Sequence, residues 1–255
     1  MFESFESILN SYPLTPFQWA LAIFSAVLVG ISKSGLNSIS IINVTLLALL
    51  FGSKTSTGIL LPMLILGDIL AVIYYKRHVH WQSLLRLSPY VIVGILLGVW
   101  VGKDLNEGVF KKMMASIVLI MVAGMFYLEH KPLENVSSSR FIASFVGITT
   151  GFTSMVGNQA GGFATAYFMS MRLPKVHFIG TYSWLFLFIN VFKLPFHIFS
   201  WHTVNASSIG INCFLFPFQI VGFYAGVYTV KQINEARYRK IILWLTAFSA
   251  LVVFF

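Results

Sequence analysis

Lys33 is the residue whose type and position in this sequence most clearly suggest chemistry. It lies in the polar segment GISKSGLNS, residues 30–38, between apolar blocks over 17–31 and 39–51. A charge inside a membrane is costly and usually functional, although a lysine side chain can also extend to the membrane interface. A helix that restarts near Ser38 would add free backbone N–H groups, which favour anions. The segment predicts an anion site formed by Ser32, Lys33, Ser34, Gly35 and Asn37.

A second polar segment, FTSMVGNQAGG over residues 152–162, offers donors without a fixed charge. From it we expect Gly157, Asn158 and Gln159 to take part. Asn190 and Lys193 lie one helical turn apart further along the chain and could complete the site, although a lysine near a helix end would look the same. Asp68 lies in the middle of its apolar block, where it could carry a proton or form a structural ion pair.

The composition indicates that these residues are positioned by membrane helices. Hydrophobic residues make up 57% of the 255-residue chain and charged residues only 10%, whereas soluble domains carry about 25% charged residues. The apolar blocks are continuous rather than alternating, which favours helices over a membrane barrel. The net charge of +9 comes from short basic loops, so we expect no nucleic-acid partner. The single cysteine, the scattered histidines and the lack of a nucleotide-binding loop predict no metal, no cofactor and no ATP-driven pump.

The sequence also contains an internal repeat. KDLNEGVFKK, residues 103–112, matches KQINEARYRK, residues 231–240, and the two polar segments lie at matching places upstream. We therefore expect an N-terminal segment over 1–16, a first membrane repeat over 17–128, a linker over 129–140 and a second repeat over 141–255. The predicted fold is an all-α polytopic membrane protein with two homologous repeats, each beginning with a Gly-rich broken or re-entrant helix. Broken helices in corresponding positions of two halves are typical of transporter binding sites.

The arrangement of the repeats stays open. The blocks beside each polar segment are shorter than the roughly 20 residues that cross a bilayer. If each broken segment is a re-entrant hairpin, each half crosses three times and the repeats are inverted; if each is a single crossing, each half crosses four times and they are parallel. Both arrangements leave an excess of Lys and Arg on one side, which places both termini outside the cytoplasm.

Three segments together resemble the sulfite exporter TauE/SafE family over essentially the whole chain: GISKSG, GILLPMLILGDILAVIYYKRHVHW and GTYSWLFLFINVFKLPFHIF. The resemblance implies a secondary transporter in the cell membrane, the inner membrane in bacteria, that exports sulfite, organosulfonates or related small anions and is not an enzyme. It adds Thr181 to the expected substrate-binding residues. The partners expected are the small anion, the lipid bilayer and possible further copies of the chain. The alternatives are an accessory subunit of a membrane enzyme complex and a transporter of another small anion.

Overall fold

The computed structural model describes residues 12–76, 78–106, 108–110, 112, 113, 116 and 140–252. These residues form helices and no strands, as the composition predicts. Five of the helices are long and apolar enough to cross a membrane. Most of the predicted N-terminal segment, the apolar block over 113–128 and the linker lie outside the described residues. The helices are α2 (Pro16–Lys33), η1 (Asn37–Ile39), α3 (Ser40–Phe51), α4 (Ser53–Tyr75), α5 (Trp81–Gly102), α7 (Arg140–Gly157), α8 (Gly161–Ser170), α9 (Lys175–Phe199), α10 (Ala206–Gln232) and α11 (Glu235–Val252).

The first polar segment forms the turn of a helical hairpin. Helix α3 folds back along α2, since the rings of Tyr12 and Phe51 are 5.3 Å apart and the Ser25 hydroxyl donates to Asn43 Oδ1 at 3.4 Å. The helix before the break is longer than the sequence suggests, because α2 has 18 residues and is by length and composition a candidate membrane span. The helix continues through Ser32 and Lys33, whose polar side chains are buried against the protein.

The second polar segment also joins two helices that turn back on each other. Both the first half of α7 and the end of α8 lie beside the beginning of α5. A methyl group at Gly147 of α7 would lie 2.6 Å from Tyr90 Cβ, and the Ser83 hydroxyl donates to the sulfur of Met171, just after α8, at 3.1 Å. The break between the helices covers only residues 158–160, so it is shorter than the sequence suggests.

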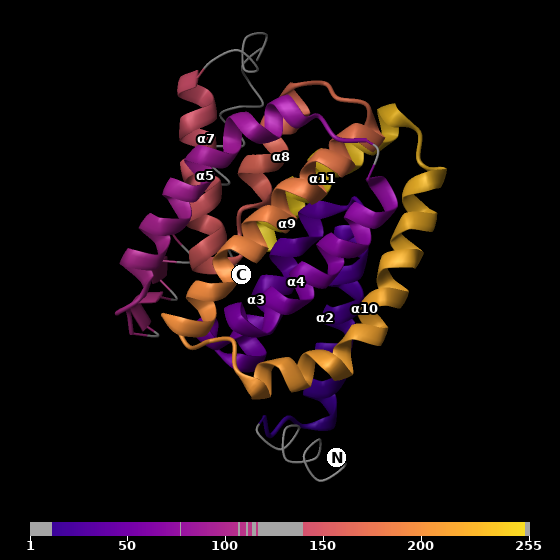
Figure 1. The fold of residues 1–255 in the computed structure, drawn as a ribbon. Coiled ribbons are helices and arrows are strands. Elements are labelled where there is room, and N and C mark those ends of the chain that lie inside the picture. The colour runs from indigo at the N-terminus through magenta and orange to yellow at the C-terminus, as the bar shows by residue number, and fades with distance from the viewer. Residues whose placement is uncertain are drawn as a thin grey trace.

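Glycines allow two pairs of helices to pack at very short distance. A methyl group at Gly30 of α2 would lie 2.1 Å from the Gln219 carbonyl oxygen of α10, and one at Gly151 of α7 would lie 2.1 Å from the Val91 carbonyl oxygen of α5. Such contacts require small residues, as in other membrane helix pairs. Figure 1 shows α5 beside α7 at one edge of the molecule and α10 at the opposite edge. Gly94 of α5 and Gly222 of α10 pack equally closely, because a methyl group there would lie 2.1 Å from the Ile148 carbonyl oxygen and 2.2 Å from the Val27 carbonyl oxygen.

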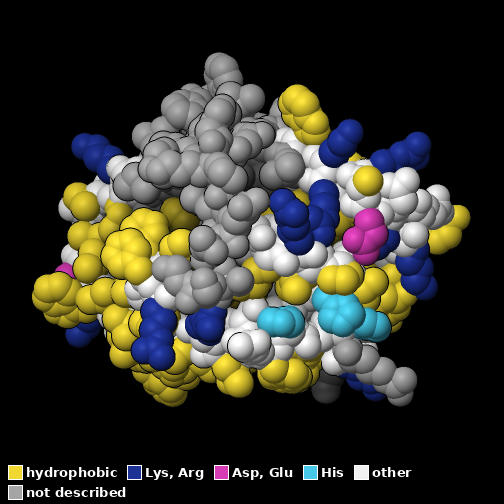
Figure 2. Space-filling view, turned by 90° about the horizontal axis from the view of Figure 1, so that it is seen from above, with side chains coloured by type: hydrophobic (Ala, Val, Ile, Leu, Met, Phe, Trp, Pro, Cys, Tyr) yellow, Lys and Arg dark blue, Asp and Glu magenta, His cyan; other side chains and the backbone are white. Residues whose placement is uncertain are grey.

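Two lysines mark opposite ends of the molecule. At the Lys54 end, where α4 begins and α9 has just ended, Lys54 Nζ lies 5.9 Å from the Trp201 ring and donates to the carbonyl of Lys103 at 3.1 Å. At the Lys175 end, where α9 begins and α10 ends, Lys175 Nζ donates to the carbonyls of Val230 at 3.1 Å and Ile233 at 2.6 Å. Figure 2 looks onto the end where α11 begins and shows Lys, Arg and His side chains on this face.

Candidate anion-binding site

Lys33 is joined to Asp68 and Asn190 by short hydrogen bonds in the protein interior. Its Nζ lies 2.6 Å from Asp68 Oδ1, and Asn190 Nδ2 donates to Asp68 Oδ2 at 2.6 Å. Asp68 and Asn190 are fully buried, and Lys33 is only 6% exposed. Helices α2, α4 and α9 each supply one of the three side chains. The ion pair accounts for both charges, which would otherwise be very costly inside the protein.

Lys193 fastens the second break to α9. Its fully buried ammonium donates to the Ser154 carbonyl at 2.9 Å, to the Ser154 hydroxyl at 3.0 Å and to Asn158 Oδ1. Asn158 adopts a left-handed backbone conformation, with φ of 55°, which asparagine tolerates better than most residues. Its Nδ2 donates to the Thr57 carbonyl near the start of α4 at 3.1 Å. The three donors of Lys193 are therefore used to hold the break.

Two tyrosine hydroxyls hold the first break. Tyr75, the last residue of α4, donates to the Ser34 carbonyl at 3.0 Å, and Tyr238 of α11 donates to the Gly35 carbonyl at 2.6 Å. Gly35 has a backbone φ of 131°, a conformation that residues other than glycine rarely adopt. The hairpin of α2 and α3 therefore ends near the Lys175 end of the molecule, whereas that of α7 and α8 ends near Thr57 at the Lys54 end.

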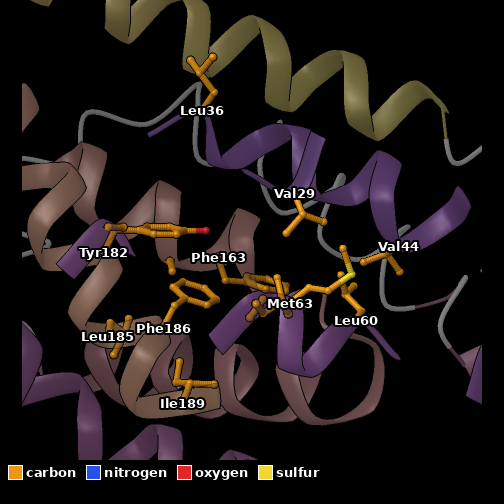
Figure 3. Close-up of a cluster of buried hydrophobic side chains, with 14 of the residues drawn as sticks. Val29, Leu36, Val44, Leu60, Met63, Phe163, Tyr182, Leu185, Phe186 and Ile189 are labelled. Carbon is orange, nitrogen blue, oxygen red and sulfur yellow. The ribbon is translucent and has the colours of Figure 1, made fainter. Parts of the chain in front are cut away.

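Both breaks border one cavity between the two hairpins. Its polar lining comes from Ser32, Lys33, Asn37, Ser40, Asn43, Ser154, Asn158, Tyr182 and Asn190, and its other lining residues are Val29, Val44, Leu60, Leu64, Gly161 and Phe186. Figure 3 shows Val29, Val44, Leu60, Tyr182 and Phe186 gathered from four helices around this region. The cavity volume is about 20 Å³, roughly what one water molecule needs. The cavity therefore has room for little more than one water molecule in this structure.

The electrostatics of the cavity favour an anion. Lys33 lines the cavity and pairs with Asp68, and Lys193 is buried beside the second break, so these three groups carry a formal excess of one positive charge. Nδ2 of Asn37 and of Asn43 has no hydrogen-bond partner among the described residues. Buried donors without partners cost free energy, and an anion would satisfy them together with the excess charge. In the part of the chain that the structure describes, no three side chains are grouped as ligands for a metal ion.

The comparison with protein families tests the resemblance that the sequence shows. The family model described as sulfite exporter TauE/SafE matches residues 22–253. The chain belongs to the sulfite exporter TauE/SafE family. TauE/SafE proteins are membrane transporters of sulfur-containing anions rather than enzymes, and the long apolar helices agree with a multi-pass membrane protein. No curated protein and no solved structure shows significant similarity to this chain.

The structure brings some of the expected residues of this TauE/SafE protein together and leaves others apart. Ser32, Lys33, Asn37, Asn158 and Asn190 line the cavity, and Asp68 and Lys193 contact lining residues. Ser34, Gly35 and Gln159 belong to the breaks and Gly157 is the last residue of α7, but none of the four is among the lining residues. Thr181 lies elsewhere, because its hydroxyl accepts a hydrogen bond from the His80 N–H at 2.8 Å.

Sequence reasoning missed the polar face of α3. Ser40 and Asn43 line the cavity. Asn37, Ser40 and Asn43 follow one another at intervals of three residues, so they lie on one side of the chain where it turns into α3. Ser25 on α2, which is fully buried, holds Asn43 from behind. The available signal was a single asparagine inside a largely apolar helix of this TauE/SafE protein. Asparagine is rarely buried without a partner.

Proposed function

We propose that this chain exports small sulfur-containing oxyanions, sulfite or organosulfonates, and that the cavity between the two hairpins is the binding site. The observation that carries the proposal is the meeting of both breaks around Lys33. Irregular backbone at membrane depth is tolerated where it lines a cavity, and broken helices of this kind hold the substrates of secondary transporters.

The excess positive charge supports an anion over a neutral or cationic substrate. Lys33 contacts Asp68 and borders the cavity. An anion that enters the cavity could therefore accept a hydrogen bond from the Lys33 ammonium, which now donates to Asp68. Lys193 acts through Asn158 and Ser154 as a positioning residue, because its donors are directed at the second break. Protonation of Asp68 would release Lys33 to the substrate, which makes Asp68 the candidate for proton coupling.

The two halves support a mechanism of alternating access by inverted repeats. Lys54 and Lys175 make the same kind of contact with the two loops of shared sequence, but at opposite ends of the molecule. The two hairpins likewise end near opposite ends. We take these as re-entrant hairpins in two inverted repeats, the first of the arrangements that the sequence left open. Each hairpin then closes one entrance of the cavity, and the two entrances open in turn.

The basic residues support an orientation with the Lys175 end in the cytoplasm. Lys175, Lys231, Arg237, Arg239 and Lys240 all lie at or beside this end of the chain path. Cytoplasmic loops of membrane proteins carry an excess of Lys and Arg. Helix α11 leaves this end, so the proposed orientation places both termini outside the cytoplasm, in the inner membrane if the protein is bacterial.

Transport into or out of liposomes tests the proposed function. The purified full-length chain is reconstituted, and the flux of labelled sulfite, sulfoacetate and thiosulfate is compared with that of empty liposomes. We expect at least one of these anions to cross faster with the protein present. The flux should be lost in Lys33→Ala and kept in Lys240→Ala, a control at an exposed lysine. Equal flux in Lys33→Ala and wild type would contradict the assignment of the cavity.

A further inference from the structure

The orientation of the Asn190 amide is fixed by its neighbours. Nδ2 donates to Asp68 Oδ2 at 2.6 Å, while the other oxygen of Asp68 accepts from Lys33. An ionised carboxylate can only accept hydrogen bonds, so the amide cannot turn over without placing its oxygen against the oxygen of Asp68. Asn190 Oδ1 is therefore the atom left over, and it is buried without a hydrogen-bond partner among the described residues. Asn190 also lines the cavity.

In Asn43 of α3, the amide nitrogen rather than the oxygen is left without a partner within the residues that the structure describes. The Ser25 hydroxyl donates to Asn43 Oδ1 at 3.4 Å, which leaves Asn43 Nδ2 as a buried donor without a partner in the described part of the chain. Asn37 Nδ2 is in the same condition, and both residues line the cavity with Lys33. The residues that line the cavity thus include a donor side, formed by Lys33, Asn37 and Asn43, and a buried carbonyl acceptor without a partner among the described residues, Asn190 Oδ1.

We infer that the transported anion carries a hydrogen-bond donor of its own. Its oxygens accept from the donor side, and its O–H or N–H group donates to Asn190 Oδ1. Hydrogensulfite and sulfonates with a hydroxyl or amino group meet this requirement. An anion without an O–H or N–H group leaves the Asn190 carbonyl unpaired. Sites built for a hydrogen bond discriminate strongly against ligands that cannot make it. The inference rests on the proposed function and narrows its substrate class.

Matched pairs of anions test this inference by direct binding to the purified full-length protein. Hydrogensulfite is compared with chlorate, which has the same charge and pyramidal shape but no proton. The second pair is 2-hydroxyethanesulfonate and propane-1-sulfonate, in which a methyl group replaces the hydroxyl. We expect the anion with the donor to bind about tenfold more tightly in each pair. Isothermal titration measures both affinities under the same buffer conditions, at a pH where hydrogensulfite predominates.

Two variants separate the cavity acceptor from a general loss of a buried amide. Asn190→Leu removes the acceptor, and the preference for the anion with the donor should fall to about one. Asn212→Leu removes another buried amide, one that bonds the Ile59 carbonyl of α4 and does not line the cavity, and the preference should persist. Equal binding within both pairs in the wild type would overturn the inference and leave the proposed function intact. Binding of none of the four anions, together with no flux in liposomes, would overturn the proposed function as well.

Discussion

Replacing Lys33 with Met should destabilise the protein and abolish transport for two separable reasons. Asp68 is fully buried, and after the substitution it keeps only the hydrogen bond from Asn190. Breaking one partner of a buried ion pair costs about 3 to 5 kcal/mol. Because Asn190 still donates, we expect the lower figure, about 3 kcal/mol, which is roughly 6 to 12 °C in Tm for a chain of this size.

The double variant Lys33→Met with Asp68→Asn separates stability from function. It removes both charges, so most of the lost Tm should return, since neutral replacements of a buried pair are often tolerated. Transport should stay absent, because no ammonium then faces the cavity. Tm is followed by intrinsic tryptophan fluorescence in detergent, and transport by anion flux in liposomes. A double variant as unstable as the single one would refute the electrostatic reasoning, and one that transports at the wild-type rate would refute the role of Lys33.

Three further predictions concern packing, orientation and energy. Gly30→Val should lower the stability of the fold by about 3 kcal/mol, because even a Cβ at this position meets the backbone of α10. The control Gly108→Ala, where the nearest atom to the added Cβ is 3.6 Å away, should leave the Tm unchanged. A Gly30→Val protein with the wild-type Tm would contradict the packing. A C-terminal reporter that is active only in the cytoplasm should stay silent, and a fluorescent one would reverse the proposed orientation. Efflux of a monovalent anion should be faster when the Lys175 end faces the negative side, because the membrane potential then adds a driving force of about 2.3 kcal/mol per 100 mV. A flux that does not depend on the sign of a potassium-diffusion potential would exclude uncoupled export.

The sequence predicts the fold class and the main charged residue because both depend on composition along the chain. The long apolar blocks predict membrane helices, and Lys33 stands out because no other charge interrupts its two blocks. The ends of the breaks are harder to predict. Ser32 and Lys33 suggest irregular backbone in the sequence, but both belong to α2. Lys33 finds its partner in Asp68 of α4, and the Ser32 hydroxyl donates to the Asn37 carbonyl just beyond the break.

The partners within the site depend on tertiary contacts that no local pattern reports. Lys33 and Asp68 are 35 positions apart, and Asn190 is 122 positions beyond Asp68. Asn43 is embedded in an apolar block, so its role becomes visible only when α3 folds back on Ser25. Thr181 is expected in the site only from the family resemblance. In the structure its hydroxyl accepts a hydrogen bond from the N–H of His80, just before α5.

The different fastenings of the two breaks make the cavity's two entrances unequal. The first break is held by neutral hydroxyls, those of Tyr75 and Tyr238, and the second by the ammonium of Lys193. Hydrogen bonds with a charged partner are roughly twice as strong as neutral ones. Opening the Lys175 end therefore breaks neutral bonds at the tip of the first hairpin, whereas opening the Lys54 end breaks bonds of a buried ammonium. For an exporter with the Lys175 end in the cytoplasm, the entrance held by the two tyrosines is the one that faces the substrate before export.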